Sequence, residues 1–485
     1  MNKLEKARAY EKKKQKTIPE DTRPAYHVIP AIGWMNDPNG FSEYKDEYHL
    51  FYQYYPYDVI WGPMHWGHCT TKDFIRWEYA AAALAPDESY ETGCFSGSAL
   101  ENSQGEHFLM YTSHYEDREK NINEETQSIA IGDGLNYHKY ENNPVITKEM
   151  IPEGFSGEDF RDPKIWLESD DWYAVIGAKK EDGRGAVLLY ESNNGYQWEY
   201  RKVLFENSGK YGKMWECPDF FELDGKSILI VSPMEMKSDG LEFHDGYGVI
   251  YSIGDYDRMS YDYKSEKIKT LEYGLDFYAP QSMRTKDGRR IMIGWMRAWD
   301  NDMTPKGFLW TGSMTIPREL TIKSGILCQW PVREIQNYYQ NEVYYEHQTL
   351  EAGIKKTLPG IAGRTFDLTI EVQTSDFSEL TISFAENEQY RTTVTICKDR
   401  EILQFSRRFS GMMKDVNDSR IMPVEFPAGQ ISLRILADKY SMEIFVNQGQ
   451  QAMTFLITTP LEAEGISFLA DAETKINVRK YDIVL

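Results

Sequence analysis

The sequence predicts an all-β protein, with a five-bladed β-propeller followed by a C-terminal β-sandwich. Three observations support this fold class: a high aromatic content, one motif that recurs at a near-constant spacing, and an alternation of apolar residues with period two toward the C-terminus. The 33 tyrosines, 22 phenylalanines and 12 tryptophans favour strands. A chain of 485 residues is too long for one hydrophobic core, so we expect more than one domain.

An internal repeat indicates the propeller. Four segments place Asp or Asn four positions before an aromatic residue: Asp73 and Trp77, Asp133 and Tyr137, Asn194 and Trp198, and Asp257 and Tyr261. The aromatic residues stand at positions 77, 137, 198 and 261, which are 60, 61 and 63 residues apart. Strand-like runs and turn signals lie between the copies, so each unit holds about four strands, the make-up of a propeller blade. Residues 30–330 span five such units.

Toward the C-terminus the pattern changes to strands with one buried face. Apolar and polar residues alternate in three segments, 365–372, 379–384 and 431–436. Short strands of this kind, joined by turns, describe a β-sandwich. We therefore expect a sandwich over residues 348–485, after a propeller over residues 26–332.

Two segments lie outside these domains. Residues 333–347 are polar and contain no Gly or Pro, which predicts a linker formed by a helix. Residues 1–25 form a basic N-terminal segment with a short surface helix. Seven basic side chains stand among its first seventeen residues, so a partner-binding arm is the alternative to a solvated helix face.

Composition and charge argue against several classes of function. The formal net charge of −22 repels phosphate backbones and anionic lipid, so we expect no nucleic-acid partner and no membrane partner. The chain holds no apolar run of about 18 residues that would span a bilayer. The five cysteines are dispersed without a CxxC pair. His65 and His68 have a metal-like spacing, but Gly67 and the strand-rich setting oppose a helical zinc motif, so we expect no metal and no cofactor. The dispersed cysteines and the lack of a secretory signal predict a cytoplasmic protein.

Three carboxylates stand in motifs that suit chemistry. Asp37 lies within the stretch Asn-Asp-Pro-Asn-Gly, Asp162 lies between Arg161 and Lys164, and Glu216 follows a tryptophan. The two cations are expected to keep Asp162 ionised, whereas the apolar neighbours of Glu216 are expected to raise its pKa, as suits a general acid. A turn and a surface salt-bridge cluster are the structural alternatives for the two aspartates. The three residues are 125 and 54 positions apart, close to two repeat units and one, so a propeller brings them toward one mouth.

Glycoside hydrolysis is the reaction that these groups suit. It needs two carboxyl groups across one bond, about 5 to 5.5 Å apart when configuration is retained. The segments FYQYYP, IWGPMHWGH and CFSGSAL add aromatic rings, amides and hydroxyls, which bind the faces and the hydroxyl groups of a sugar.

Seven motifs carry a resemblance to a known family. In order, they are WMNDPNG, FYQYYPYDVIWGPMHWGH, GCFSGSAL, FRDPK, WECPDFF, FYAPQS and IMIGWM. They closely resemble the motifs of glycoside hydrolase family 32, the family of invertases, sucrose-6-phosphate hydrolases and fructanases. The resemblance continues through MTIPREL at 314–320 and SMEIFVNQGQ at 441–450, so it covers almost the whole chain. It implies a five-bladed propeller followed by a β-sandwich, in agreement with the repeat.

The resemblance also implies roles for residues at matching positions. Asp37 would be the nucleophile that attacks the fructosyl unit, Glu216 the general acid and then base, and Asp162 the group that stabilises the transition state. The residues implied to bind the sugar are Trp34, Met35, Asn36, Gln53, Trp61, Phe95, Ser96, Arg161, Tyr278 and Trp295.

The expected function is that of a retaining β-fructofuranosidase acting on sucrose 6-phosphate or sucrose, with a small sugar as its partner molecule. Sucrose 6-phosphate is favoured because a sugar imported with phosphorylation reaches the cytoplasm in that form. An intracellular fructo-oligosaccharide hydrolase and a non-catalytic sugar-binding propeller are the alternatives, and the latter requires loss of Asp37 or Glu216. The candidate ligands of a phosphate are His114, Arg118, Lys179, Lys180, Lys213 and Arg297.

Overall fold

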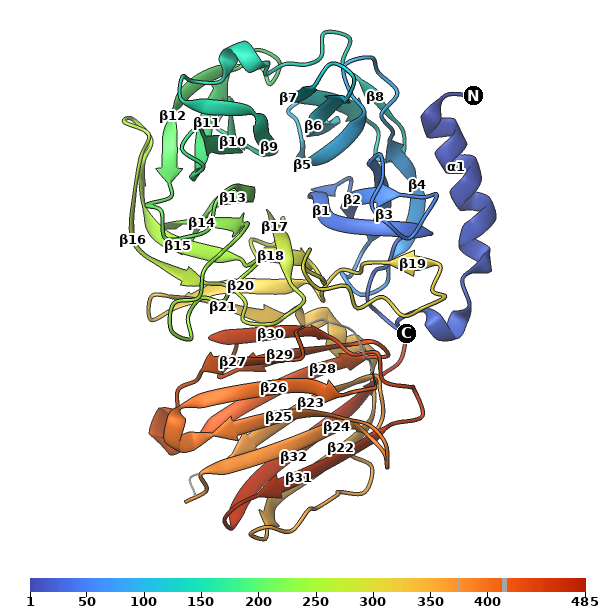
Figure 1. Cartoon of the computed structure of the whole chain (residues 1–485), viewed down its shortest axis with the longest axis vertical. Helices are drawn as coiled ribbons and strands as arrows, with labels where there is room; N and C mark the ends of the chain where they lie inside the picture. The colour runs from blue at the N-terminus through green and yellow to red at the C-terminus, as the bar shows by residue number, and fades with distance from the viewer. Residues whose placement is uncertain (374–375, 412–416) are drawn as a thin grey trace.

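The computed structural model describes residues 1–373, 376–411 and 417–485, and it shows two parts (Figure 1). Five small sheets stand in a ring, and two larger sheets pack against each other below it. Nearly all elements are strands, and the one α-helix in the described ranges, α1 (Lys3–Lys14), lies beside the ring. The all-β prediction is confirmed.

Each sheet of the ring is built from antiparallel strands that are nearly consecutive in sequence. The first sheet contains β1 (Gly33–Tyr44), β2 (Glu47–Tyr55), β3 (His65–Thr71) and β4 (Glu78–Leu84), and the second contains β5 (Gly93–Glu101), β6 (His107–Asp117), β7 (Ile122–Gly132) and β8 (Tyr137–Lys139). After η3 (Lys148–Met150), the third contains β9 (Phe155–Glu168), β10 (Asp171–Lys180), β11 (Gly185–Ser192) and β12 (Glu199–Glu206). The fourth contains β13 (Trp215–Leu223), β14 (Lys226–Pro233), β15 (Ile250–Asp257) and β16 (Asp262–Thr270), and the fifth contains β17 (Tyr278–Arg284), β18 (Arg290–Trp295), β20 (Arg318–Lys323) and β21 (Ile326–Pro331).

The ring closes through its first strands. β1 lies beside β5, β5 beside β9, β9 beside β13 and β13 beside β17, and β17 returns to β1. β19 (Trp310–Thr311), which lies between β18 and β20 in the chain, pairs in parallel with the start of β1. The first strand of every sheet therefore lines the centre of the ring (Figure 1).

The repeated motif occupies one structural position, the turn between the third and fourth strands. Its side-chain oxygen accepts hydrogen bonds from the backbone N–H groups two and three residues ahead at Asp73, Asp133, Asn194 and Asp257. These Asx turns explain why Asp or Asn begins each copy. The corresponding turn of the fifth sheet consists of Ser324 and Gly325, with φ of +50° and +74°, which is why only four copies occur.

The sandwich has a six-stranded and a five-stranded sheet. The first is formed by β22 (Tyr339–Leu350), β32 (Thr474–Ile483), β23 (Phe366–Val372), β28 (Ile431–Asp438), β29 (Ser441–Val446) and β30 (Gln451–Leu456). The second is formed by β27 (Ser419–Pro423), β26 (Ile402–Phe409), β25 (Arg391–Cys397), β24 (Glu379–Glu386) and β31 (Gly465–Ala470), with η5 (Lys398–Arg400) and η6 (Pro427–Gly429) in its connections. The predicted faces are confirmed, since Phe366, Leu368, Ile370 and Val372 are all buried in the core of the sandwich.

The helix predicted over residues 333–347 is wrong. η4 (Arg333–Tyr338) is a short 3-10 stretch, and the chain then continues as β22, the edge strand of the six-stranded sheet. Half of the side chains of β22 are exposed, so the segment shows little alternation; Leu350 lies in the sandwich core, and Val343 and Tyr345 pack against it. Its conformation is decided by antiparallel pairing with β32, more than 100 residues away in the chain.

The predicted N-terminal helix is confirmed. Asn2 caps α1 by accepting a hydrogen bond from the N–H of Glu5, whose carboxylate accepts one from the N–H of Asn2. The helix packs on β4, where Arg8 donates to the carbonyl of Ala82 and Glu11 accepts from its N–H. Two short turns, η1 (Gln15–Thr17) and η2 (Glu20–Thr22), lead from α1 to the ring.

A buried network of charged groups joins the ring to the sandwich. His27 Nδ1 lies 2.9 Å from Asp438 Oδ2, and its Nε2 lies 2.8 Å from Glu443 Oε1. Arg318, which is fully buried, forms ion pairs with Glu443 and with Glu272. Burial by itself would lower the pKa of His27, but the hydrogen bonds to the two carboxylates outweigh it and raise the pKa to about 9. Each charge is thus balanced, and removal of one partner would leave another uncompensated in the interior.

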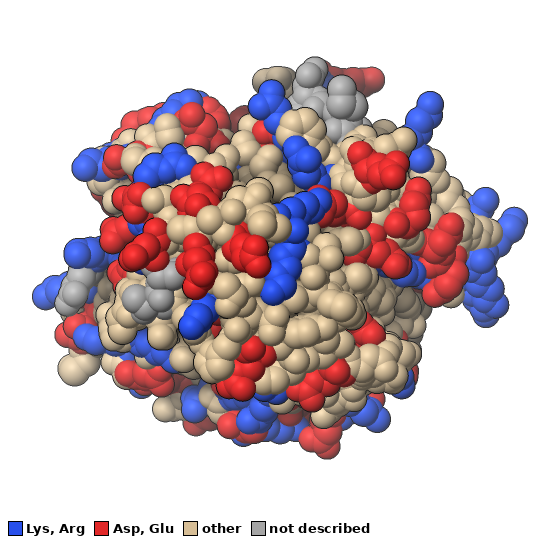
Figure 2. Space-filling view, turned by 90° about the horizontal axis from the view of Figure 1, so that it is seen from below, with Lys and Arg blue, Asp and Glu red and all other residues tan. Residues whose placement is uncertain are grey.

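The outer surface carries both signs of charge. Figure 2 shows the sandwich end from below, with Lys and Arg side chains interspersed among Asp and Glu. On this face the basic side chains have acidic neighbours, which weakens local attraction for anions. No helix in the described ranges is both long enough and apolar enough to cross a membrane.

The His27 network predicts a pH dependence of stability. Because the pKa of His27 is raised to about 9 in the folded chain, its stabilisation is full below the unfolded value near 6.5 and is lost as pH rises through the folded value. His27→Gln should therefore lower the free energy of unfolding at pH 6 by on the order of 3 kcal/mol, and the difference should shrink toward pH 9.5. Denaturant unfolding across this pH range measures the difference in the free energy of unfolding. His138→Gln, at an exposed position, is the control. Parallel profiles for wild type and His27→Gln would contradict the assignment.

Candidate active site

The innermost strand of every sheet carries an extra residue within its pairing with the second strand. Its pairing with the second strand shifts register between Met35 and Pro38, Phe95 and Gly97, Arg161 and Lys164, Glu216 and Asp219, and Tyr278 and Gln281. A bulge of this kind leaves a residue unpaired and turns the side chains beside it. All three carboxylate motifs lie at these bulges, so the same local device presents each of them at the centre of the ring.

Proline marks four of the five bulges. The dipeptides are Asp37-Pro38, Asp162-Pro163, Cys217-Pro218 and Ala279-Pro280. Proline has no N–H to give to the strand ladder, so it is tolerated where a bulge has removed the partner. The preceding residue has a left-handed backbone in three cases, with φ of +66° at Asp162, +49° at Cys217 and +48° at Ala279. Non-glycine residues adopt this conformation only where the surrounding structure enforces it.

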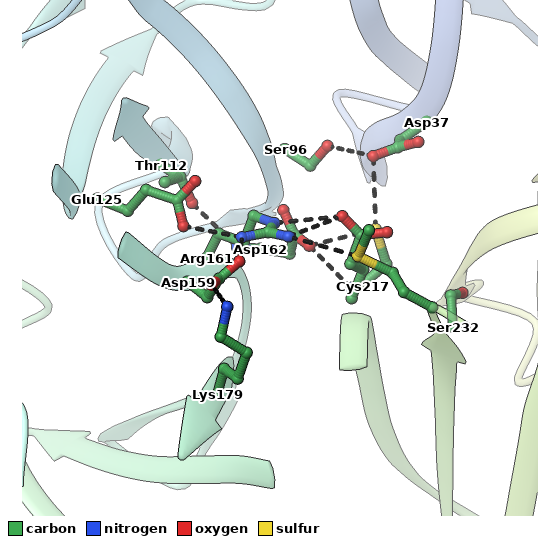
Figure 3. Close-up of polar contacts among 12 residues, drawn as sticks. Asp37, Ser96, Thr112, Glu125, Asp159, Arg161, Asp162, Lys179, Cys217 and Ser232 are labelled. Atoms are coloured by element: carbon green, nitrogen blue, oxygen red, sulfur yellow. Dashed lines mark hydrogen bonds and ion pairs between the residues drawn. The ribbon is translucent and has the colours of Figure 1, made fainter. Parts of the chain in front are cut away.

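Cys217 connects the carboxylates. Its backbone N–H donates to Asp162 Oδ2 at 2.9 Å, and its Sγ lies 3.5 Å from Asp37 Oδ2 and 3.6 Å from Asp162 Oδ2 (Figure 3). Burial raises the pKa of the Cys217 thiol, so the sulfur stays protonated and acts as a neutral donor. Since Cys217 directly follows Glu216, the structure brings Asp37, Asp162 and Glu216 together from β1, β9 and β13. In the part of the chain that the structure describes, no group of three His, Cys, Asp or Glu side chains is arranged to hold a metal ion.

Arg161 is the cation of this site. Its guanidinium donates to Glu216 Oε1 at 3.0 Å. On its other side it donates to Glu125 Oε2 at 3.1 Å and to Asp159 Oδ1 at 2.9 Å (Figure 3). Lys179 forms an ion pair with the same Asp159. Two carboxylates therefore fix one side of the Arg161 guanidinium, and its other side bonds to Glu216.

The expectation that Arg161 and Lys164 keep Asp162 ionised is wrong. The guanidinium of Arg161 bonds to other carboxylates, and Lys164 extends to Asp219 Oδ1 at 3.3 Å. Burial raises the pKa of Asp162, the charge of Arg161 opposes the rise in part, and the negative charges of Glu216 and Asp37 add to it. The sequence places two cations beside Asp162, but strand alternation and the bulge direct them elsewhere.

Glu216 has the environment of a proton donor. Tyr278 donates its hydroxyl hydrogen bond to Glu216 Oε2 at 2.7 Å. Burial raises the pKa of Glu216, the charge of Arg161 and the Tyr278 hydroxyl oppose the rise, and the charge of Asp37 adds to it. The net rise agrees with the sequence-based expectation. A carboxyl group with a raised pKa keeps its proton closer to neutral pH and is suited to general acid catalysis.

Asp37 is oriented by neighbours that the resemblance implied to be sugar ligands. Ser96 Oγ donates to Asp37 Oδ2 at 2.7 Å, and Asn36 Nδ2 donates to Asp37 Oδ1 at 3.1 Å. Trp34 Nε1 in turn donates to Asn36 Oδ1 at 2.7 Å. These contacts fix the carboxylate plane through two donors, each on a different oxygen.

The other predicted sugar ligands surround this group at different depths. Trp61 is 46% exposed and meets Phe95 edge to face, so the two rings stand near the surface. Trp295 is fully buried against Trp34, and its indole N–H has no partner among the described residues. Gln53 is also buried and donates to a backbone carbonyl of β5.

Met35 does not join this group. Its side chain is fully buried in a core cluster that also contains Phe41 and Leu50. Neighbours along a strand point to opposite faces, so the side chain next to Trp34 turns away from the site. Met35 was expected to bind the sugar, but the structure places its side chain in the core and not in the site.

Three polar residues of the site were not identified from the sequence. Glu125 and Asp159 hold Arg161, and Thr112 Oγ1 accepts the backbone N–H of Asp162 at 2.9 Å. Asp159 stands two residues before Arg161, on the same face of β9, and this spacing was an available signal. Glu125 lies in the segment INEETQS beside another glutamate, and nothing local distinguishes it.

Comparisons with known proteins agree with this geometry. Residues 27–331 match the family described as glycosyl hydrolases family 32 N-terminal domain, and residues 334–483 match glycosyl hydrolases family 32 C terminal. The chain belongs to glycosyl hydrolase family 32.

Its relatives include enzymes with named substrates. A sucrose-6-phosphate hydrolase of Escherichia coli is 36% identical over 462 residues, which cover 92% of this chain and 91% of that protein. Raffinose invertase of Escherichia coli is 34% identical over 459 residues, which cover 92% of each. A solved GH32 beta-fructofuranosidase of Bombyx mori is 34% identical with a TM-score of 0.87, covering 99% of this chain and 98% of that chain.

Replacing Tyr278 by Phe tests whether the Tyr278 hydroxyl controls the pKa of Glu216. The Tyr278 hydroxyl favours the charged form of Glu216, so its removal should raise the pKa of Glu216 further. The basic limb of the pH profile of kcat/KM for sucrose hydrolysis is expected to move upward by roughly half a unit to one unit. Tyr190→Phe in the third sheet, where the tyrosine hydroxyl bonds to the backbone carbonyl of Met150, is the matched control and should leave the limb in place. An unchanged limb in Tyr278→Phe would show that this hydrogen bond does not tune the acid.

Proposed function

We propose that the chain is a retaining β-fructofuranosidase that hydrolyses the fructosyl bond of sucrose 6-phosphate or sucrose. The observation that carries this proposal is the meeting of Asp37, Asp162 and Glu216 from the bulges of three innermost strands. Retaining glycoside hydrolysis requires one carboxylate to attack and one carboxylic acid to protonate the leaving oxygen. Membership of family 32 and the names of the relatives support the same reaction.

In the first step, a carboxylate oxygen of Asp37 attacks the anomeric carbon of the fructosyl unit. The bond from that carbon to the glycosidic oxygen breaks, and Glu216 gives its proton to the departing oxygen. In the second step, Glu216 takes a proton from water, whose oxygen attacks the same carbon and releases Asp37. The free fructose leaves with the configuration it had in the substrate.

Asp162 is proposed to hold hydroxyl groups of the fructosyl ring. Its Oδ2 already accepts the Cys217 N–H, so the other oxygen remains available for a sugar hydroxyl. Such hydrogen bonds strengthen as positive charge develops on the ring, and they stabilise the transition state more than the ground state. The proposed wall of the sugar pocket comprises Trp34, Asn36, Gln53, Trp61, Phe95, Ser96, Tyr278 and Trp295, with Arg161 behind Glu216.

The architecture is proposed to be a five-bladed β-propeller over residues 26–332, with each four-stranded sheet as one blade, followed by the sandwich over residues 348–485. The ring of innermost strands supports this interpretation, and β22 extends the sandwich back to residue 339. A cytoplasmic location is proposed together with the phosphorylated substrate. The five cysteines are free thiols, as a reducing compartment favours.

The glucosyl part of the substrate must lie on the side of Glu216, because Glu216 protonates the oxygen that leaves with it. Among the cations considered for a phosphate, Lys179 is connected to this side through Asp159 and Arg161. Arg118 is bonded to Glu116 on an exposed loop, and Lys213 is bonded to Glu235. Because Lys179 shares Asp159 with Arg161, and its side chain is still 33% exposed, it is the candidate that we propose for the 6-phosphate.

Replacing the two principal carboxylates tests the reaction. Asp37→Ala should lower kcat for sucrose by about 10⁴-fold or more, on the order of 5 kcal/mol, because the nucleophile acts only in the transition state. Glu216→Gln should lose a similar amount on sucrose but retain far more activity on an aryl β-fructoside, whose leaving group needs no proton.

Asp171→Asn, an exposed carboxylate of β10, is the control and should keep full activity. Retention of more than about a tenth of wild-type kcat in Asp37→Ala, a loss below roughly 1.4 kcal/mol, would refute the nucleophile assignment.

Lys179→Ala tests the phosphate assignment. We expect KM for sucrose 6-phosphate to rise severalfold while KM for sucrose stays nearly constant, because only the first substrate carries a dianion. The preference of wild type for sucrose 6-phosphate should weaken as added salt screens the contact. Arg118→Ala, on its exposed loop, should change neither KM. Equal effects of Lys179→Ala on both sugars would exclude a phosphate contact at this residue.

A further inference from the structure

A cavity of about 550 Å³ lies further along the five innermost strands, beyond the bulges that carry the carboxylates. β1 runs from Asp37 to a cavity-lining residue at Phe41, and β9 runs from Asp162 to one at Trp166. Four residues of extended strand cover about 13 Å, so the cavity is separate from the three carboxylates. Its walls come from all five innermost strands, as the walls of the active site do.

Two arginines stand face to face in this cavity. Arg284, the last residue of β17, is directly opposite Arg290, the first residue of β18, in the antiparallel register, and both line the cavity. Like charges at directly opposed positions of a sheet destabilise it. A pair of this kind is unfavourable in the empty protein and becomes favourable when an anion lies between the two guanidinium groups.

Neither arginine has a carboxylate partner. In the described ranges, no Asp or Glu lies within ion-pair distance of Arg284 or Arg290. The guanidinium of Arg290 lies over the ring of Phe221, 4.3 Å from its centroid, and its Nε is buried without a hydrogen-bond partner. The hydroxyl of Ser282, two residues before Arg284 on the same strand, is also buried and unpartnered. Donors have thus been placed in the cavity that the protein itself does not satisfy.

The other cations of the cavity are already neutralised. Lys164 pairs with Asp219, Arg258 pairs with Glu168, and Lys286 pairs with Glu43 and Asp46. Two carboxylates of the lining remain: Glu222, which lies 3.7 Å from Arg258, and Glu101, which is exposed. Among the described residues, neither forms an ion pair with Arg284 or Arg290. Arg284 and Arg290 are therefore the two cations of the lining that have no ion-pair partner among the described residues, in a chain whose formal net charge is −22.

We propose that this cavity is a second ligand site, which binds a small phosphate monoester between Arg284 and Arg290. Two guanidinium forks match the oxygens and the double negative charge of a phosphate monoester, and a carboxylate offers fewer acceptors. The aromatic rings of Trp166, Phe220 and Tyr256 line the same cavity and provide flat apolar surface for the organic group of the ester. The site stands on its own residues, and its failure would leave the proposed hydrolase function unchanged.

Inorganic phosphate and glycerol 3-phosphate are the probes. Isothermal titration calorimetry on the full chain at low ionic strength should show binding of both, tighter for glycerol 3-phosphate, and unaffected by saturating fructose in the catalytic site. Arg290→Gln and Arg284→Gln should each weaken binding by at least tenfold. Arg201→Gln, an arginine paired with Glu191 elsewhere on the ring, is the matched control and should bind as wild type does.

Thermal unfolding gives an independent readout, in which the ligand-free variant should be more stable than wild type although it binds phosphate less tightly. Without ligand, Arg284→Gln should raise the melting midpoint because it removes the like-charge pair, and added phosphate should raise the midpoint of wild type but not of this variant. Neither arginine belongs to the proposed catalytic machinery, so kcat on sucrose without phosphate should be unchanged in both variants. Any of four results would overturn the proposal. Phosphate does not bind, or it binds Arg290→Gln as tightly as wild type. Alternatively, fructose displaces it, or glycerol 3-phosphate binds no more tightly than inorganic phosphate.

Discussion

The extra residue in each innermost strand is the constraint on which the site depends. A regular strand would point alternate side chains toward the two neighbouring sheets, and the centre of the ring would be lined by backbone and small side chains. An added residue in β1, β9 and β13, next to a proline that has no N–H for the strand ladder, presents Asp37, Asp162 and Glu216 at the centre of the ring. Ring closure then brings these three turns within hydrogen-bond distance of one connecting residue, Cys217.

This arrangement crowds three carboxyl groups into a poorly solvated space, which disfavours their charged forms. Arg161 is the cation that reaches Glu216, and its own position is secured by Glu125 and Asp159. Burial and mutual repulsion raise the pKa of Glu216 and of Asp162. The same crowding that opposes folding therefore favours the protonated form of Glu216, as its proposed role of general acid requires.

The sandwich contributes rigidity to this scaffold through buried charges. His27 and Arg318, both from the ring portion of the chain, meet Asp438 and Glu443 of the sandwich in the interior. A charged contact of this type has narrow geometric tolerance, so it fixes the two parts in one arrangement. The ring and the sandwich are consequently coupled in stability, although the carboxylates of the proposed active site all come from the ring.

The sequence by itself determined the features that arise from local pattern. Asp and Asn begin Asx turns at a fixed spacing, and this revealed the repeated sheets; period-two alternation identified the buried faces of the sandwich strands. The motifs around Asp37, Asp162 and Glu216 were recognisable from a carboxylate beside turn formers, cations or a tryptophan, and from their resemblance to the motifs of family 32.

Only the tertiary structure decided the features that depend on distant partners. Residues 339–350 are a strand because β32 pairs with them, and their exposed side chains carry little pattern of their own. Arg161 serves Glu216, 55 residues further on, instead of its neighbour Asp162. The cross-strand pair of Arg284 and Arg290 became visible only once their register was known. Local periodicity is encoded within a few residues, whereas charge partners and strand register are set by closure of the ring and the packing of the sheets.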